Sequence, residues 1–214
     1  RKPGLTAGTQ RAGLAMLSKL FMIGVQWRNR RYDSGQGVLS LSVPVVSVGN
    51  ITVGGTGKTP MTLWVCELLR QDGFHPAVVS RGYKRTAGQP ADEVVMLQRR
   101  CPGLVVITDP DRFRGGQMAI REHGVNVVVM DDGFQHRRLA RDLDIVLMDA
   151  TCPFGYEAVL PRGLLREPLS SLRRTDVFVI TRSDQVDPSE LDALQKRLGE
   201  YAPGKPIVRA VHRP

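Results

Sequence analysis

The sequence predicts an α/β fold in which a mostly parallel sheet is flanked by helices and preceded by a basic amphipathic helix. Two observations predict it. Strand-like and helix-like segments alternate after residue 34, as in a parallel sheet with crossover helices. A glycine-rich turn joins the first such strand to the first such helix. The length of 214 residues suits one α/β core, so we expect a helix over residues 1–34 and the core over residues 35–214.

The N-terminal head combines apolar helical periodicity with positive charge. Apolar residues recur at helical spacing between residues 12 and 27, and seven cations precede the first acidic residue, Asp33. A membrane-spanning helix requires about 20 apolar residues, and Lys19 interrupts this shorter stretch. Two interpretations remain open: a helix that lies on an anionic membrane surface with Trp27 near the headgroups, or a helix docked on its own domain with a solvated basic face.

The remaining elements follow from local patterns. Pro60 suits a first helical turn, where its missing N–H group costs nothing. The all-apolar run over residues 125–130 is typical of a central strand buried on both faces. We expect a polar, mobile loop over residues 85–92. Strands are expected over residues 41–48, 76–80, 104–107, 125–130, 145–148, 177–180 and 206–210, and helices over residues 60–71, 113–122 and 188–198.

The turn between the first strand and the first helix has the composition of a phosphate-binding loop. Glycines let backbone N–H groups surround polyphosphate oxygens, Lys58 reaches the outer phosphates, and the Thr59 hydroxyl can bind Mg²⁺. We therefore expect the chain to bind a nucleoside triphosphate and to have the sheet of a P-loop NTPase. Strict spacing of this motif would place glycine at position 52, where threonine stands. The nucleotide-binding residues are Thr52, Val53, Gly54, Gly55, Thr56, Gly57, Lys58 and Thr59.

Acidic residues follow the predicted central strand. Asp131 and Asp132 come at its carboxyl end, where a phosphate-loop protein holds Mg²⁺ directly or through water. Asp92 is a candidate for the carboxylate that accepts a proton from an acceptor hydroxyl, although an acidic pair on a loop can simply be solvated. Glu167 is a further candidate metal ligand, and its neighbour Arg166 is a candidate for binding a phosphate group. The alternative is that this segment is a loop held by a salt bridge.

Three arginines are candidate anion ligands. Arg81 follows the second predicted strand at its carboxyl end. Arg112 and Arg114 open a predicted helix, where cations oppose the helix dipole. Arg112 and Arg114 are therefore more typical of ligands for an external anion than of residues that stabilise a helix. The alternative is that both are ordinary surface residues.

Composition excludes other classes of protein. The three cysteines are widely spaced without a CxxC pair, so neither a disulfide framework nor a zinc site is expected, and a reducing cytoplasm fits. The net charge of +9 concentrates in an apolar head without an interleaved aromatic and basic platform, so we expect no nucleic-acid partner.

Taken together, the motifs resemble the tetraacyldisaccharide 4'-kinase family, the lipid A kinases. The double aspartate followed by Gln-His and the Thr-Gly-Lys-Thr-Pro ending are more specific than a bare phosphate loop. Where the family has Gly-Asp-Glu-Pro, this chain has Ala91-Asp92-Glu93-Val94, and a C-terminal family segment is expected to be absent. The matching segments are residues 44–50, Gly54-Gly55-Thr56-Gly57-Lys58-Thr59-Pro60, Ser80-Arg81-Gly82-Tyr83, Asp92-Glu93, Asp131-Asp132-Gly133-Phe134-Gln135-His136 and Leu165-Arg166-Glu167-Pro168.

The resemblance implies transfer of the γ-phosphoryl group of ATP, with Mg²⁺, to the 4'-hydroxyl of an acylated disaccharide 1-phosphate, giving lipid IVA. It implies a peripheral monomer at the cytoplasmic face of the inner membrane. By the same resemblance, Asp92 is the catalytic base. The implied roles are Lys58 and His136 in catalysis, Thr59, Glu93, Asp131, Asp132 and Glu167 at the metal, and Arg81, Arg112, Arg114 and Gln135 at the substrate.

Two other functions remain open. A GTP-binding switch is one, because Thr181-Arg182-Ser183-Asp184 approximates a guanine-reading element after a strand; an ordinary helix-capping loop explains it equally. A membrane-recruited partitioning ATPase without a small acceptor is the other. Such ATPases usually have an extra lysine early in the phosphate loop, and residues 51–57 contain none.

Overall fold

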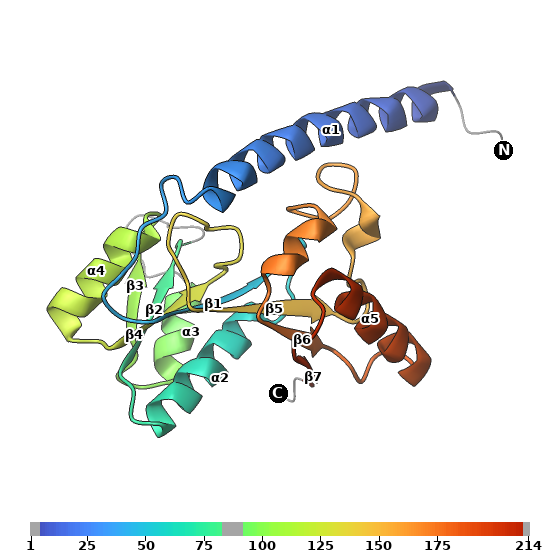
Figure 1. Cartoon of the computed structure of the whole chain (residues 1–214). Coiled ribbons are helices and arrows are strands. Elements are labelled where there is room, and N and C mark those ends of the chain that lie inside the picture. The colour runs from blue at the N-terminus through green and yellow to red at the C-terminus, as the bar shows by residue number, and fades with distance from the viewer. Residues whose placement is uncertain (1–4, 83–91, 212–214) are drawn as a thin grey trace. The chain divides into compact units, whose positions relative to one another are not determined.

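The computed structural model describes the backbone of residues 5–82 and 92–211, and the side chains of residues 11–82 and 96–211. The chain divides into two compact units. The first unit comprises Arg1–Gln36, Ile51–Thr56 and Met148–Pro214, and the second comprises Gly37–Asn50 and Gly57–Leu147. The division crosses the glycine-rich loop between Thr56 and Gly57. Figure 1 labels the helices and strands of the chain.

The second unit is built on parallel strands with the order β3-β2-β4-β1-β5. The register places Val45 of β1 beside Val128 of β4, and Pro76 of β2 beside Val127 of β4. In the first unit, β6 and β7 pair in parallel, with Phe178 beside Ile207. The strands are β1 (Val45–Asn50), β2 (Pro76–Ser80), β3 (Val105–Thr108), β4 (Val127–Asp131), β5 (Leu143–Asp149), β6 (Val177–Thr181) and β7 (Ile207–Arg209).

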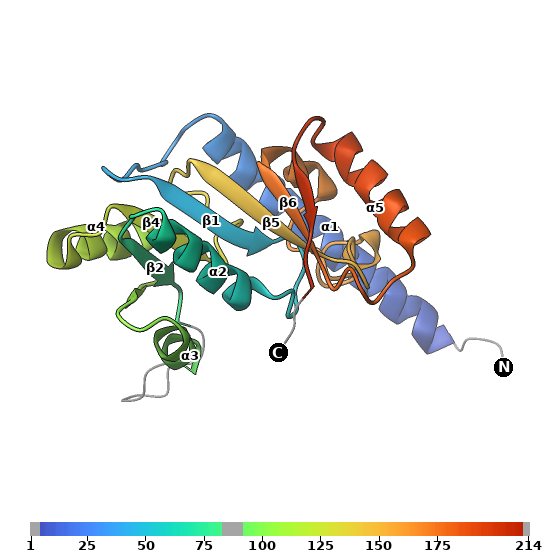
Figure 2. The same ribbon diagram turned by 90° about the horizontal axis from the view of Figure 1, so that it is seen from below.

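Helices cover both faces of the sheet in the second unit. The connections through α2 (Lys58–Gln71) and α3 (Asp92–Arg100) run along the sheet in one direction, and α4 (Arg112–His123) returns in the other. Right-handed crossovers therefore place α4 on the face opposite α2 and α3, as Figures 1 and 2 show. Because both faces are covered, strands β1, β2 and β4 are buried along their whole length.

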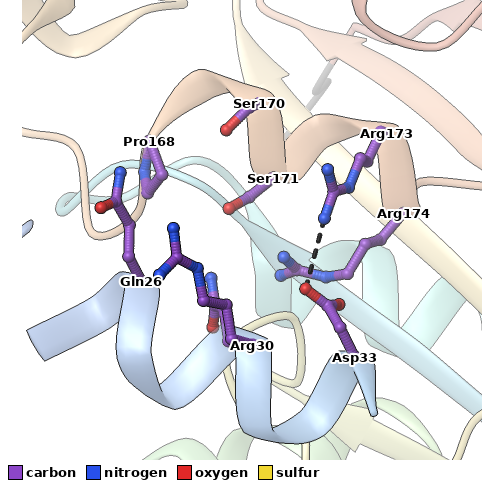
Figure 3. Close-up of a pocket in the computed structure, with 9 residues that line it drawn as sticks. Gln26, Arg30, Asp33, Pro168, Ser170, Ser171, Arg173 and Arg174 are labelled. Atoms are coloured by element: carbon purple, nitrogen blue, oxygen red, sulfur yellow. Dashed lines mark hydrogen bonds and ion pairs between the residues drawn. The ribbon is translucent and has the colours of Figure 1, made fainter. Parts of the chain in front are cut away.

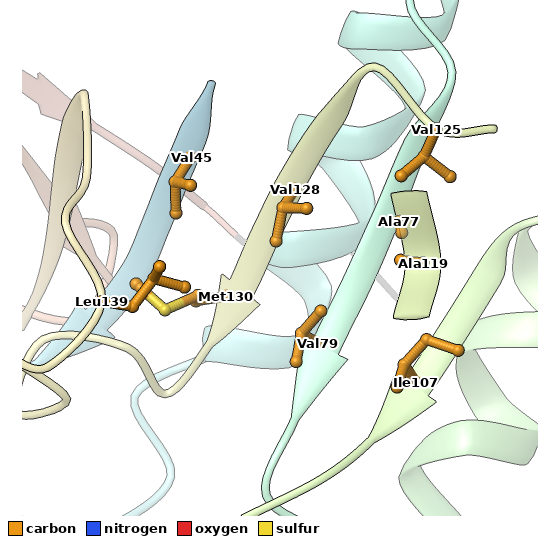
Figure 4. Packing of buried hydrophobic residues seen from close by; sticks show 9 residues of the cluster. All are labelled: Val45, Ala77, Val79, Ile107, Ala119, Val125, Val128, Met130 and Leu139. Carbon is orange, nitrogen blue, oxygen red and sulfur yellow. The ribbon is translucent and has the colours of Figure 1, made fainter. Parts of the chain in front are cut away.

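The core between α4 and the sheet consists of small and branched side chains. Ala119 of α4 is completely buried and shares a cluster with residues of β1, β2, β3 and β4 and of the segments before and after β4 (Figure 4). Asp111 caps the start of α4 by accepting hydrogen bonds from the N–H groups of Phe113 and Arg114, and Gly124 ends it in the left-handed region with φ 62°. The cluster contains Val45, Ala77, Val79, Ile107, Ala119, Val125, Val128, Met130 and Leu139.

In the first unit, α1 (Leu5–Asp33) packs through a mixed polar face. Ser18, Val25 and Asn29 are buried, and the Ser18 hydroxyl donates a hydrogen bond to the carbonyl of Val159 at 3.0 Å. The apolar side chains on the opposite face are exposed to solvent, and Trp27 is 69% exposed. None of the helices in the described part of the chain combines the length and apolar composition that a membrane crossing requires.

The other helices in the described part of the first unit are α5 (Pro188–Tyr201) and two short 3₁₀ helices, η1 (Gly155–Glu157) and η2 (Leu169–Arg174). At the start of α5 the Asp187 N–H donates to the Glu190 carboxylate at 3.2 Å, which satisfies a donor that the helix leaves unpaired. Helix α5 buries Leu191, Leu194 and Leu198.

The predicted α/β architecture is confirmed, with two differences. The first strand was expected from residue 41 and begins at Val45; Leu41 and Val43 instead pack their side chains against the core cluster. Helix α3 was not predicted, because its apolar run over residues 94–97 is only four residues long and lies between charged and polar residues. Most of the polar loop expected over residues 85–92 lies outside the described residues.

Glycine at position 49 is a steric requirement of this fold. A Cβ atom there would lie 2.6 Å from the backbone nitrogen of Phe134, which follows β4. We expect Gly49→Ala to lower the free energy of unfolding by about 1–3 kcal/mol, because the strand must move away from Phe134. Denaturant titration measures this.

The matched control is Gly199→Ala in α5, where a Cβ atom would meet nothing within 4 Å. This variant is expected to gain about 0.5–1 kcal/mol through helix propensity. Equal stability of Gly49→Ala and the parent chain would contradict the steric argument.

Candidate functional site

Asp131 is the central acid of the second unit. It ends β4 and is buried. Its Oδ1 atom accepts a hydrogen bond from the Thr62 hydroxyl at 3.1 Å, and its Oδ2 atom lies 3.5 Å from the Thr59 hydroxyl oxygen. Both threonines project from the first turns of α2, which follows β1, and β1 is the neighbour of β4 in the sheet. The predicted metal-binding pair Thr59 and Asp131 is therefore brought together.

Lys58 and Asp132 form the second contact of this cluster. The Lys58 ammonium nitrogen lies 3.7 Å from Asp132 Oδ1. Gly57, with φ 84°, is the N-cap residue of α2 and has no side chain that could cap the N–H groups of that helix end. Uncapped N–H groups together with a lysine suit a phosphate group. Asp132 has φ 54°, a left-handed conformation that aspartate tolerates better than most residues.

Hard oxygen ligands are what Mg²⁺ prefers, and it is often held by one or two carboxylates together with substrate phosphates and water. The Thr59 hydroxyl and the Asp131 carboxylate are such a set. Among the described residues no cluster of three or more acidic, histidine or cysteine side chains forms a cage for a metal. The donor set thus fits a cation that binds with a nucleotide.

The segment after Asp132 makes a tight turn against β1. A Cβ atom on Gly133 would lie 2.6 Å from the Ser47 hydroxyl oxygen, so only glycine fits there without a shift. The Gln135 amide donates a hydrogen bond to the carbonyl of Asn50 at 2.8 Å. Gln135, expected at the substrate, is thus engaged with the end of β1 in this structure.

His136 lies in a positive environment. Burial lowers its pKa to about 4, and the nearby cations Arg112 and Arg141 add to the shift. Its Nε2 atom is buried and has no hydrogen-bond partner within the described part of the chain. The imidazole is therefore neutral at neutral pH, which makes His136 a weak proton acceptor.

The three predicted anion ligands occupy different environments. The Arg112 side chain is buried, donates to the carbonyl of Asp109 at 2.9 Å, and interacts electrostatically with Asp132 and with Arg81. Burial lowers its pKa, whereas Asp132 opposes that shift. Arg114 is largely exposed and forms two hydrogen bonds to the Asp109 carboxylate, at 2.7 and 2.9 Å. Arg112 thus lies near Asp132, Arg81 lies near Arg112, and Arg114 is tied to Asp109.

The proposed base and its neighbour begin a helix. Asp92 and Glu93 form the first turn of α3, and their side chains lie outside the described residues. Their roles as base and metal ligand remain predictions.

The first unit contains the amino-terminal half of the phosphate loop. The Val53 N–H donates to the carbonyl of Leu164 at 2.8 Å, and Arg182 donates to the carbonyl of Gly55 at 2.9 Å. Arg182 also forms an ion pair with Asp149 at the end of β5. Sequence reasoning considered Arg182 only as part of a guanine-reading element; in the structure it holds the loop.

Glu167, expected at the metal, is a structural anchor in this arrangement. It is completely buried; its Oε1 accepts from Arg28 at 2.6 Å, and its Oε2 accepts from Arg174 at 2.8 Å and from Asn29 at 3.1 Å. Burial alone would raise its pKa, but Arg174, hydrogen bonding and Arg28 outweigh it, so the pKa is lowered. With both oxygens occupied, Glu167 offers no free ligand atom for a metal here.

Thr62 was missed by sequence reasoning, although it stands three residues after Thr59 on the same face of the helix. We expect Thr62→Val to weaken binding of the Mg²⁺–ATP complex by about 10–100-fold, because the Asp131 carboxylate loses the donor that orients it. Calorimetric titration with ATP, with and without Mg²⁺, measures this. Thr62→Ser keeps the hydroxyl and should bind like the parent chain; equal weakening of both variants would contradict an orienting role.

Replacing Glu167 by glutamine leaves two arginines without their anion. We expect Glu167→Gln to lower the free energy of unfolding by about 3 kcal/mol at neutral pH. Because the folded-state pKa of Glu167 is lowered from 4.5, its stabilisation is fully present above that pH and is lost as pH falls through the folded-state value.

The stability difference between parent and Glu167→Gln should therefore shrink below about pH 4.5. Denaturant titrations across acid pH measure it, with Glu200→Gln on the exposed side of α5 as the control. A difference that stays constant with pH would contradict the ionised role of Glu167.

Comparison with known proteins places these contacts in context. The family model described as tetraacyldisaccharide-1-P 4'-kinase, LpxK, matches residues 10–214. A tetraacyldisaccharide 4'-kinase of Anaeromyxobacter sp. (strain Fw109-5) is 40% identical over 220 residues, covering 95% of this chain and 59% of the relative. One of Geobacter metallireducens is 43% identical over 187 residues, covering 79% of this chain and 55% of the relative.

Solved structures agree with these relatives. LpxK from Aquifex aeolicus, crystallised in complex with ATP, superposes with a TM-score of 0.78 and 33% identity, covering 94% of this chain and 64% of that one. The signal recognition particle receptor FtsY from Elizabethkingia anophelis has a TM-score of 0.53 at 12% identity, covering 92% of this chain and 66% of that one, and shows the fold alone. The chain spans about 60% of the length of the Anaeromyxobacter relative. With the family model matched over residues 10–214, the chain belongs to the tetraacyldisaccharide 4'-kinase family.

Proposed function

We propose that this chain binds Mg²⁺–ATP and transfers the γ-phosphoryl group to the 4'-hydroxyl of a tetraacyldisaccharide 1-phosphate. The observation that carries the proposal is the cluster of Thr59, Asp131, Lys58 and Asp132 at the start of α2, in a chain that belongs to this kinase family. The ATP with which LpxK from Aquifex aeolicus was crystallised supports the choice of nucleotide.

Each residue of the cluster has a task in this reaction. Lys58, at the start of α2, contacts the outer phosphates and offsets their charge in the transition state. The Thr59 hydroxyl and the Asp131 carboxylate would hold Mg²⁺, which would supply positive charge to offset the charge of the triphosphate. Thr62 keeps the Asp131 carboxylate in position through the 3.1 Å hydrogen bond.

Asp92 is the proposed base. Its carboxylate takes the proton of the acceptor hydroxyl while the hydroxyl oxygen forms a bond to the γ-phosphorus. The bond from the γ-phosphorus to the bridging oxygen breaks at the opposite side, and ADP leaves with that electron pair. Glu93, next to Asp92, remains a proposed metal ligand. His136, with its pKa near 4, is better suited to hydrogen bonding as a neutral group than to taking this proton.

Positive charge near the acids suits an anionic acceptor. Arg112 is buried and interacts with Asp131, Asp132 and Arg81. We therefore assign contact with the phosphate groups of the substrates to Arg112 and Arg81. Arg114 serves this role only if its two hydrogen bonds to Asp109 open.

The acceptor is a membrane lipid, so the protein must reach a bilayer. Helix α1 exposes large apolar side chains, and the chain carries a net charge of +9. Both features favour peripheral attachment to an anionic membrane surface, in keeping with work at the cytoplasmic face of the inner membrane. The chain acts as a monomer in this proposal.

The test is transfer of label from γ-labelled ATP to a tetraacyldisaccharide 1-phosphate in detergent with Mg²⁺. We expect the parent chain to label the lipid, and Asp92→Asn and Asp131→Asn each to lower the rate at least about 100-fold, because proton transfer or charge neutralisation is lost. Asp72→Asn, an exposed substitution at the end of α2, should leave the rate unchanged.

Three outcomes would contradict parts of this scheme. A parent chain that binds ATP and labels no lipid contradicts the proposed activity of this chain. Full activity of Asp92→Asn contradicts the assignment of the base. Clear preference for GTP in a competition between nucleotides counts against the kinase and favours a GTP-binding switch.

A further inference from the structure

Helix α1 presents a continuous apolar stripe to solvent. Met16, Leu20, Ile23 and Trp27 are 66%, 57%, 62% and 69% exposed. Their spacing of four, three and four residues puts them on one face of the helix. The next position in the same spacing is Arg30, which is also exposed. The apolar stripe therefore ends at a guanidinium group.

Arg30 belongs to a pocket of about 150 Å³ in the first unit, between the end of α1 and η2. Figure 3 shows the side chains of Arg30 and Arg174 extending into the space between these two helices, with Ser170 and Ser171 beside them. Arg173 completes the basic wall of the pocket.

The pocket has more positive than negative charge. Arg173 pairs with Asp33 at 3.3 Å, and Arg174 is held at 2.8 Å by the buried Glu167. Arg28 contacts the other oxygen of Glu167 at 2.6 Å. Within the described part of the chain Arg30 forms no ion pair. Three arginines and one carboxylate, that of Asp33, line the pocket, so the lining carries two positive charges in excess.

These groups match the chemistry of a phosphate. Guanidinium groups bind tetrahedral oxyanions through paired N–H donors, and serine hydroxyls add further donors. Because Glu167 fixes Arg174 from the buried side, that guanidinium is oriented before any ligand arrives. The pocket is thus built for an anion of this kind.

We propose that the pocket binds the phosphate of an anionic membrane phospholipid, whose acyl chains lie along the stripe of Met16, Leu20, Ile23 and Trp27. The inference rests on the membrane attachment proposed above, and adds a headgroup site to it. A soluble anion would make no use of the stripe. A phospholipid uses both features. Its phosphate is covalently joined to its acyl chains, just as the pocket lies next to the apolar stripe.

The test compares flotation of the chain with vesicles of phosphatidylcholine alone and of phosphatidylcholine containing phosphatidylglycerol. The pocket variant is Arg30→Gln with Arg173→Gln, and its matched control is Arg11→Gln with Lys19→Gln, on α1 outside the pocket. Both double variants lose two charges, so long-range attraction to the anionic surface falls alike.

We expect the pocket variant to lose about tenfold more affinity for the anionic vesicles than the control does, since it also loses charge-assisted hydrogen bonds. Ile23→Ser should weaken binding to both kinds of vesicle and keep the preference for the anionic one. Equal losses in the two double variants would overturn the proposal, because charge alone would then explain the binding.

Two further measurements separate this site from other possibilities. Inorganic phosphate without vesicles should raise the melting temperature of the parent chain no more than chloride of equal ionic strength; a phosphate-specific rise abolished in the pocket variant would assign the pocket to a soluble anion and overturn the lipid. In the detergent kinase assay the pocket variant should label the acceptor at the parent rate. Loss of labelling in this variant would place the arginines at the acceptor and overturn the proposal. A parent chain that is inactive but still prefers anionic vesicles would contradict only the kinase function.

Discussion

The candidate site depends on one adjacency in the parallel sheet, that of β1 and β4. Their register places Val48 of β1 beside Asp131 of β4, so the chain that leaves β1 to form α2 starts close to the acid that ends β4. Thr59 and Thr62 reach Asp131 because of this adjacency. Gly133 preserves it, since any side chain there would push β1 and the turn apart. The chemistry of the cluster is thus a consequence of strand order.

Buried charge in the first unit depends on complete pairing. A carboxylate removed from water costs several kcal/mol unless its oxygens are bound by cations or donors. Glu167 meets this condition through Arg28 and Asn29 of α1 and Arg174 of η2. The same interactions fix the end of α1 against its unit. Through these ion pairs and hydrogen bonds, Glu167 positions the helix that carries the apolar stripe.

Local patterns in the sequence predicted much of the fold and part of the site. The strand over residues 76–80 and the acid at the end of β4 follow from short apolar runs and from what parallel strands do at their carboxyl ends. The contacts of Glu167 with Arg28 and of Arg182 with Gly55 join residues 139 and 127 positions apart. No local periodicity encodes such pairs. The sequence accordingly led to the prediction of a metal role for Glu167, with a salt-bridged loop as the alternative.

Helix α1 reverses the usual distribution of polar and apolar residues. Its docked face uses the Ser18 hydroxyl and the Asn29 amide, whereas Trp27 and Ile23 face solvent. Burying one large apolar side chain stabilises a fold by about 1.5–3 kcal/mol. The exposed side chains of α1 do not contribute this energy to their own unit, so hydrophobic burial within the unit does not explain why they are apolar. Polar anchors give the helix a fixed position without consuming its apolar surface. In the membrane attachment proposed above, a helix held in this way keeps that surface available for a bilayer, and the guanidinium groups at its end would bind the charged headgroups at the depth where the apolar stripe stops.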